Sequence, residues 1–260
     1  MFVIAHRGAN KLAPQNTIHA FLKAAELKSD GVETDVHVTK DGELVLCHNG
    51  TVDKTSDGRG RISDMCLSDL KRFDFGSWFG RRFKNTTIPT LDEFLQTMKD
   101  TAVSVLNIEL KPQKGGRLDF VDTVIQKAKE YGLADKLFIS SFDYRILDKA
   151  KSLEPCVRTG YLYPAMGDIV KRKLFSPMNI VRKYNIDYLL PHQGYVSKKL
   201  IEKAHDAGKR GAVWTVNKLE TAEKLSHWGA DGVITDFPDI AFHHIIHCNV
   251  DCIRKITDNT

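Results

Sequence analysis

The chain has 260 residues, 42% hydrophobic and 27% charged, with a formal net charge of +5 at pH 7. This composition is ordinary for a soluble globular protein and supplies ample apolar side chains for a large core. The charge is modest and no run of five or six like charges occurs, so a nucleic-acid-binding arm is not expected. A mild positive balance suits an anionic small-molecule substrate.

The cysteine pattern and the absence of long apolar runs indicate the cellular compartment. The five cysteines are scattered without a C-x-x-C pair, which is not the pattern of a disulfide framework. The first residues carry no basic segment and only a short apolar run, so no signal peptide is expected. No stretch approaches the ~18 apolar residues of a membrane-spanning helix. We therefore expect a cytoplasmic protein with no membrane span, and the sequence gives no basis for an oligomeric state.

Short apolar runs alternate with amphipathic segments along the whole chain, the pattern of a parallel α/β fold. Strands are predicted to start near Phe2, Val32, Val103, Leu137, Val157, Ile186, Gly211 and Gly232. Helices are predicted over residues 16–27, 91–99, 119–131, 144–152, 169–184, 197–207, 221–228 and 240–247. Eight strands in ~250 residues predict a TIM (β/α)8 barrel, in a single domain over residues 1–260. An open doubly wound sheet is the alternative, but no G-x-G-x-x-G turn supports it.

One interval breaks this rhythm, because the second and third strands lie about 70 residues apart. It contains an extra strand over residues 43–48, a polar loop over 49–62, and a segment with five aromatic residues, Phe73, Phe75, Trp78, Phe79 and Phe83. We interpret residues 43–90, approximately, as a small insertion at the barrel mouth, where long loops usually carry function. The aromatic residues form either a small core of the insertion, which we favour, or a platform for lipid tails.

Two predicted strands carry ionisable residues on one face. Side chains alternate across a strand, so Glu33 and Asp35 point the same way, and so do Asn107, Glu109 and Lys111. Burying a lone carboxylate is costly unless a cation or hydrogen bonds compensate. Three carboxylates that converge from two strands therefore indicate a divalent metal held by oxygen ligands, and hence an enzyme site. Salt bridges lining a barrel core are the alternative.

Histidines lie at two predicted strand ends. The segment His6-Arg7-Gly8 ends the first strand, and an imidazole beside a guanidinium suits an anion undergoing acid–base chemistry. His48 closes the extra strand, so one histidine can take a proton from a nucleophile while the other gives one to the leaving group. His37 shares the face of the strand carboxylates but is expected past the strand end, so we favour a solvated position, or one beside the metal ligands, over a ligand role.

These residues belong to a series of short motifs in a consistent order. The first are H-R-G at 6–8, P-Q-N-T at 14–17, G-V-E-T-D-V at 31–36, T-K-D-G at 39–42 and His48. The later ones are I-P-T-L at 88–91, N-I-E-L-K at 107–111, V-W-T-V-N at 213–217 and D-G-V-I-T-D at 231–236. Over nearly the whole chain, this series resembles the signature of the glycerophosphodiester phosphodiesterase family.

The resemblance implies a TIM barrel that uses one divalent cation, Mg²⁺ or Ca²⁺. Such enzymes cleave deacylated phospholipids such as glycerophosphocholine to sn-glycerol 3-phosphate and an alcohol. The positions to which the resemblance gives roles are the metal ligands Glu33, Asp35 and Glu109, the acid–base pair His6 and His48, and the phosphate contacts Arg7 and Lys111. In the family's proposed route, the glycerol hydroxyl attacks phosphorus and water opens the resulting cyclic phosphate. We also expect Trp214 to line the pocket, either stacking on a choline-like head group or acting as barrel packing.

The chain departs from the family's pattern at two positions. It has Gln15 and Asn49 where the family commonly has glutamate and aspartate. A carboxylate beside a catalytic histidine orients the ring and stabilises its charged form, whereas Asn49 keeps a hydrogen bond without the charge. If that aspartate helps catalysis, turnover is expected to be reduced or its pH profile moved; if the aspartate is structural, Asn49 is harmless. Two other functions compete with the leading one: a lysophospholipase D-type activity on acylated substrates, and a catalytically weak homologue that binds phosphodiesters.

The C-terminal segment carries residues at metal-ligand spacing, namely His243, His244, His247, Cys248 and Cys252. No companion C-x₂₋₄-C pair elsewhere completes a zinc site, so a terminal helix is the favoured interpretation.

Overall fold

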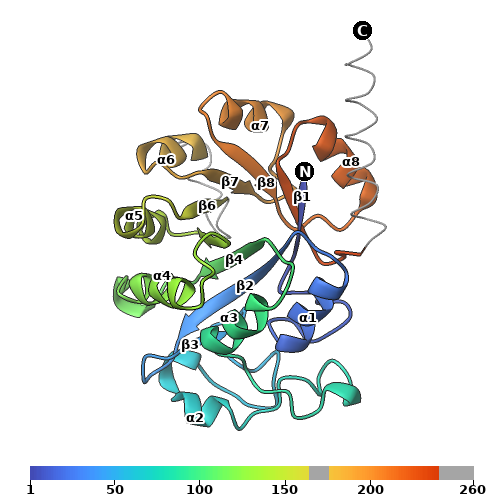
Figure 1. Ribbon diagram of the computed structural model, residues 1–260, viewed down its shortest axis with the longest axis vertical. Helices are drawn as coiled ribbons and strands as arrows, with labels where there is room; N and C mark the ends of the chain where they lie inside the picture. Colours follow the sequence, from blue (N-terminus) through green and yellow to red (C-terminus); the bar gives the residue numbers. More distant parts are fainter. Residues whose placement is uncertain (164–175, 240–260) are drawn as a thin grey trace.

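A closed barrel of parallel strands forms the centre of the computed structural model, which describes residues 1–163 and 176–239. Its eight strands are β1 (Phe2–Ala5), β2 (Gly31–Val38), β4 (Val105–Leu110), β5 (Leu137–Ser141), β6 (Arg158–Tyr163), β7 (Tyr188–Pro191), β8 (Arg210–Val213) and β9 (Gly232–Thr235). Strand β1 pairs with both β2 and β9, and these pairings close the barrel. The predicted TIM barrel is therefore confirmed, and the open sheet is excluded (Figure 1).

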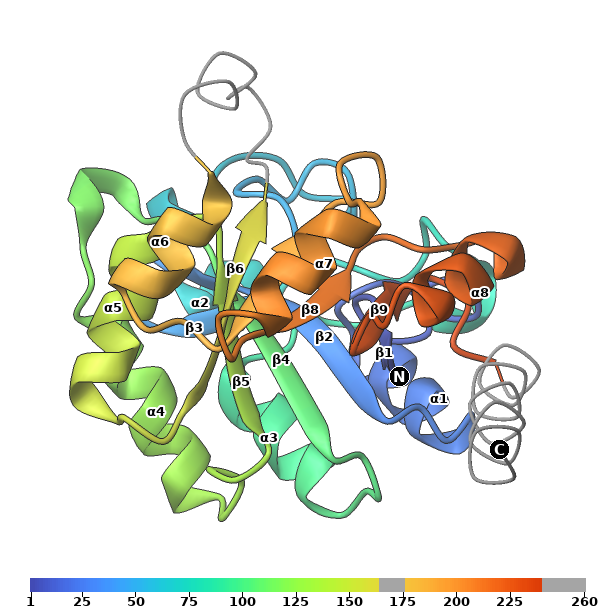
Figure 2. The ribbon, with the colours of Figure 1, turned by 90° about the horizontal axis from the view of Figure 1, so that it is seen from above.

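Helices connect the strands and lie on the outside of the barrel (Figure 2). They are α1 (Ile18–Glu26), α3 (Leu91–Lys99), α4 (Phe120–Glu130), α5 (Tyr144–Leu153), α6 (Pro177–Lys183), α7 (Lys198–His205) and α8 (Leu219–His227). Each overlaps a predicted helix. The first part of predicted helix 169–184, helix 240–247 and the histidine- and cysteine-rich tail lie outside the described residues. Within the described ranges, no helix has the length and apolar character needed to cross a bilayer.

Local sequence signals explain where helices begin and which face they bury. Thr90 starts α3 with a capping box, because its hydroxyl accepts from the Glu93 N–H and the Glu93 carboxylate accepts from the Thr90 N–H. The apolar faces of α1 and α3 then meet through Phe21 and Phe94, whose rings lie edge to face at 4.7 Å and are fully buried. The strand residues Val32, Leu106 and Ile108 belong to the same buried apolar cluster as these two rings, so the polar residues that alternate with them face the inside of the barrel.

The segment between β2 and α3 extends the sheet by one strand and has a small core of its own. It contains β3 (Leu44–Leu46), which pairs antiparallel with β2, then η1 (Ile62–Asp64), α2 (Leu67–Leu70) and η2 (Arg81–Phe83). Its small core includes Val45, Ile62, Leu70, Phe75 and Ile88.

The aromatic segment of this insertion divides into two parts. Phe75 is 5% exposed and belongs to the small core, and Phe73 packs against that core. Trp78 is 45% exposed and stacks edge to face on Phe79, outside this core. The favoured interpretation as a small core therefore holds for the first two aromatic residues and is wrong for Trp78.

Asp74 organises the chain around these aromatic residues. Its carboxylate accepts hydrogen bonds from the backbone N–H groups of Gly76 (2.7 Å), Ser77 (2.9 Å) and Asn85 (3.0 Å) and from the Ser77 hydroxyl. We expect Asp74→Ala to lower the free energy of unfolding by about 2 kcal/mol, since several donors lose their charged acceptor. Urea denaturation measures this loss. The exposed Asp69→Ala on α2 is the control, and an equal loss in both variants would contradict the prediction.

Candidate active site

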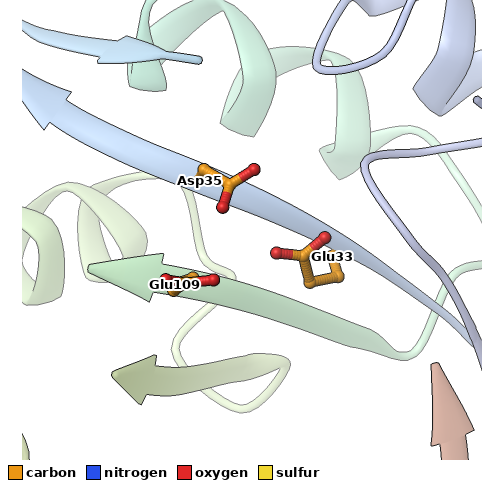
Figure 3. A group of neighbouring side chains, drawn as sticks. All are labelled: Glu33, Asp35 and Glu109. Carbon is orange, nitrogen blue, oxygen red and sulfur yellow. The ribbon is translucent and has the colours of Figure 1, made fainter. Parts of the chain in front are cut away.

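Three buried carboxylates meet where β2 and β4 lie side by side. The two strands are parallel, and their register places Glu33 opposite Asn107 and Asp35 opposite Glu109. Because alternate residues share a face, all these side chains point the same way. Glu33, Asp35 and Glu109 are 4%, 1% and 8% exposed, and one carboxylate oxygen from each lies within 4.8 Å of the others (Figure 3). The convergence predicted from the alternation is therefore present.

Charges within this cluster are unevenly balanced. The Lys111 ammonium lies 2.7 Å from Asp35 Oδ1 and also donates to Glu109, while Arg7 Nε lies 3.6 Å from Asp35 Oδ2. Although burial alone would raise it, these two cations hold the pKa of Asp35 below its usual range. Burial raises the pKa of Glu33, with the charges of Asp35 and Glu109 adding to it, and burial also raises the pKa of Glu109. Two carboxyl groups that resist ionisation beside an ionised third make a site that gains from a further cation.

Asn16 holds the Asp35 carboxylate in position through a hydrogen bond. It is 3% exposed with a positive φ of 56°, a conformation that asparagine tolerates better than most residues. Its Nδ2 donates to Asp35 Oδ2 at 2.8 Å, and its Oδ1 accepts from the Thr34 hydroxyl at 2.8 Å. Next to it, Gln15 Oε1 accepts from Arg7 Nη1 at 2.6 Å. Gln15 thus keeps a contact with the guanidinium in spite of lacking a charge.

His6 lies at the end of β1 against a carboxylate at the end of β9. The two chain segments run side by side, since the His6 N–H donates to the Thr235 carbonyl at 2.9 Å. His6 Nδ1 lies 2.6 Å from Asp236 Oδ1. Asp236 also accepts from Nδ2 of Asn10 (2.6 Å) and of Asn217 (2.8 Å). Burial lowers the pKa of His6 although Asp236 opposes this, and hydrogen bonds hold the pKa of Asp236 below its usual range in spite of burial.

Neither Asp236 nor Asn10 was predicted to have a role at the site. The available signal was position, because Asp236 directly follows the last barrel strand and therefore lies at the same mouth as His6. Nothing in the spacing of these residues indicated that the two side chains touch.

His48 follows β3 and is half-buried. Its Nδ1 lies 2.8 Å from Asn49 Oδ1, so the amide keeps the hydrogen bond expected of it. Burial, reinforced by the charges of Arg7 and Lys111, lowers the pKa of His48 to about 4. The expectation that His37 lies past the strand end is wrong, because it is inside β2 and its Nε2 lies 3.4 Å from the His48 carbonyl oxygen.

Backbone hydrogen bonds bring both histidine segments to the carboxylate cluster. The Arg7 N–H, next to His6, donates to Glu33 Oε2 at 2.9 Å. The Cys47 N–H, next to His48, donates to the Asp35 carbonyl at 3.0 Å. Two histidines from different elements thus flank one group of carboxylates.

Trp214 follows β8 and is half-buried in the barrel wall. Its indole N–H donates to the Leu190 carbonyl at 2.8 Å. The ring meets Phe142 and His192 edge to face, with centroids 5.6 Å and 5.0 Å apart. These contacts fix the ring, and its role toward a substrate stays a prediction.

Comparison with known proteins agrees with this arrangement. Residues 6–240 match the model of the Glycerophosphoryl diester phosphodiesterase family. A glycerophosphodiester phosphodiesterase of Caldanaerobacter subterraneus subsp. tengcongensis is 36% identical over 237 residues, which cover 91% of this chain and 94% of that protein. An Oleispira antarctica phosphodiesterase, solved in complex with the product sn-glycerol-3-phosphate, is 30% identical with a TM-score of 0.79, covering 96% of this chain and 97% of that one.

A crystal structure from Silicibacter pomeroyi supports the fold alone, with a TM-score of 0.85 at 24% identity over 96% of this chain and 94% of that one. The family match covers most of the chain, from His6 at the end of β1 through β2, β4 and β9, which carry or border the site. The chain belongs to the glycerophosphoryl diester phosphodiesterase family, a family of phosphoric diester hydrolases.

Proposed function

We propose that this protein is a metal-dependent hydrolase of glycerophosphodiesters, which it converts to sn-glycerol 3-phosphate and an alcohol. The observation that carries the proposal is the group of three buried carboxylates at the barrel mouth, flanked by two histidine segments. Burial and the neighbouring carboxylates raise the pKa values of Glu33 and Glu109, so the cluster lacks the positive charge of a balanced salt-bridge network, and a bound cation would supply it.

Glu33, Asp35 and Glu109 would hold the divalent cation. They offer only oxygen donors, which suit the hard cations Mg²⁺ and Ca²⁺. The raised pKa values of Glu33 and Glu109 fit this assignment, because a bound cation favours their ionised forms. When bound, the cation supplies positive charge to the phosphodiester oxygens and lowers the pKa of a hydroxyl that coordinates it.

His6 and His48 would move protons at their Nε2 atoms. In each ring Nδ1 lies against an oxygen, Asp236 Oδ1 for His6 and Asn49 Oδ1 for His48. Nδ1 is therefore the protonated nitrogen of a neutral ring, and Nε2 is left to accept or return a proton. One ring, in its neutral form, would take the proton of the attacking hydroxyl, and the other, protonated at both nitrogens when the step begins, would give its Nε2 proton to the leaving alcohol oxygen.

Arg7 and Lys111 would balance the charge that develops on phosphorus-bound oxygens. Both contact Asp35, so each is placed at the edge of the carboxylate cluster. The half-buried Trp214 would form the wall that faces the alcohol portion, where an aromatic ring favours a cationic head group.

Asp236 would act as a positioning residue for His6. We expect Asp236→Asn to lower kcat about 100-fold with little change in KM, because the ring loses its fixed orientation. The carboxylate also raises the pKa of His6, so its loss lowers that pKa further. NMR titration of the His6 ring measures the shift directly. Asp206→Asn, exposed at the end of α7, is the control; an unmoved His6 titration would refute the assignment.

Asn49 offers a test of the second histidine. Asn49→Asp places a negative charge beside a ring whose pKa is about 4, so we expect that pKa to rise by about one unit or more. The limb of the pH–rate profile that reports His48 then moves to higher pH. A profile and a His48 NMR titration that both stay in place would contradict this prediction.

Release of sn-glycerol 3-phosphate from glycerophosphocholine tests the proposed function. Purified protein is assayed with Mg²⁺, with Ca²⁺ and with EDTA, and then with other head groups and with acylated substrates. Metal-dependent release supports the proposal. Folded protein that binds the cation but turns over none of these substrates would refute it and favour a phosphodiester-binding protein. Turnover of acylated substrates alone would favour a lysophospholipase D-type activity.

A further inference from the structure

Large apolar side chains are exposed on one connected part of the surface. Among the described residues, the large hydrophobic side chains that are exposed are Leu12, Leu22, Trp78 and Phe237, at 43–45%, and Tyr195 at 46%. The first four lie on the loop after β1, on α1, in the insertion and on the loop after β9. Scattered apolar residues need no explanation, but a contiguous set does.

Contacts join these elements into one surface. Arg82 Nη2 donates to the Leu12 carbonyl at 2.9 Å, which ties η2 to the loop after β1. A groove of about 320 Å³ between them is lined by Leu12, Leu22, Arg82 and Phe83, among others. The stack continues edge to face from Phe83 through Phe79 to Trp78, with centroids 5.5 Å and 5.7 Å apart.

The same surface extends to the barrel mouth. The Lys11 ammonium lies 5.8 Å from the centroid of the Phe237 ring and 3.6 Å from Asp236 Oδ2. Asp236 in turn contacts His6. We call the whole set the rim surface, defined by Lys11, Leu12, Leu22, Trp78, Phe79, Arg81, Arg82, Phe83, Lys84 and Phe237.

Positive charge accompanies the apolar residues. Arg81, Arg82 and Lys84 are exposed, and none of them forms an ion pair with a carboxylate in the part of the chain that the structure describes. Lys11 is also exposed, and Asp236 is its only ion-pair partner among the described residues. Exposed cations interleaved with tryptophan, phenylalanine and leucine match the chemistry of an anionic interface, where aromatic rings lie at the head-group level.

We propose that the rim surface docks on a lipid bilayer that contains anionic phospholipids. The arginine and lysine side chains contact lipid phosphates, while Leu12, Trp78 and Phe237 enter the head-group region. Docking in this orientation places the barrel mouth at the membrane. Docking of this kind does not depend on the proposed hydrolysis.

Vesicle flotation tests the docking. Wild-type protein is expected to float with vesicles of phosphatidylcholine and phosphatidylglycerol, not with phosphatidylcholine alone, and high salt should release it. The triple variant Arg81→Gln, Arg82→Gln, Lys84→Gln is expected to bind about 100-fold more weakly, since each basic residue near the surface strengthens binding about fivefold. The matched control, Lys99→Gln, Lys199→Gln, Lys203→Gln, removes three exposed charges from α3 and α7 and should bind like wild type.

Tryptophan fluorescence provides a second readout that does not depend on the charges. The emission of Trp78 should shift to shorter wavelength on anionic vesicles, and Trp78→Phe should lose that shift while still floating. Failure of wild type to float, equal loss in the two triple variants, or an unshifted Trp78 would each overturn the proposal. Hydrolysis of soluble glycerophosphocholine, assayed without vesicles, reports on the proposed function alone, so the two failures are distinguishable.

Discussion

Glu33→Gln is expected to lower kcat for glycerophosphodiester hydrolysis about 1,000-fold, the loss that removing several kcal/mol of cation stabilisation produces. The substitution keeps the shape of the side chain and an oxygen that can accept from the Arg7 N–H. It removes one negative charge from a cluster that, by our proposal, holds a divalent cation. Steady-state kinetics at increasing Mg²⁺ or Ca²⁺, with calorimetric titration of each metal, measure both effects.

Glu43→Gln is the matched control for this experiment. Glu43 precedes β3 and is exposed, so the same chemical change should leave the kinetics and metal affinity at wild-type values. If Glu33→Gln keeps wild-type metal affinity and turnover, the carboxylate cluster is a structural network and the proposed metal site is wrong.

His48→Ala is expected to lower kcat about 1,000-fold as well, within the range that a general acid or base contributes. Metal affinity should stay unchanged, because the substitution leaves all three carboxylates in place. This contrast separates proton transfer from metal binding. Kinetics and calorimetry on the same preparation measure it.

The exposed His227 on α8 provides the comparison. Its ring contacts the Glu223 carbonyl in its own helix, and His227→Ala should leave kcat unaffected. A His48 variant that is folded, binds metal and turns over within a few-fold of wild type would exclude this ring from proton transfer.

The barrel and its carboxylates were predictable because they follow from local periodicity. Alternation along a strand places Glu33 and Asp35 on one face, and the succession of strands and helices leads to a closed parallel barrel. A capping box at Thr90 is also a local feature, because its two partners, Thr90 and Glu93, are three residues apart in the sequence.

Contacts between distant residues were not predictable in the same way. Asp236 touches His6 across 230 positions of sequence, and that contact exists only because β1 and β9 pair to close the barrel. From their spacing, the aromatic residues of the insertion were expected to act together. In the folded chain Phe75 is buried and Trp78 is exposed. Which of the two is buried depends on the residues that fill the small core.

The fold class, the family resemblance and the convergence of three carboxylates follow from the amino-acid sequence, since each rests on short motifs or on strand alternation. Three contacts are visible only in the folded chain: Asn16 holds Asp35, Asp236 holds His6, and Lys111 lies between two carboxylates. The physical reason is that a side chain's hydrogen-bond partners depend on which strand ends meet at the mouth, and strand closure is a property of the whole chain.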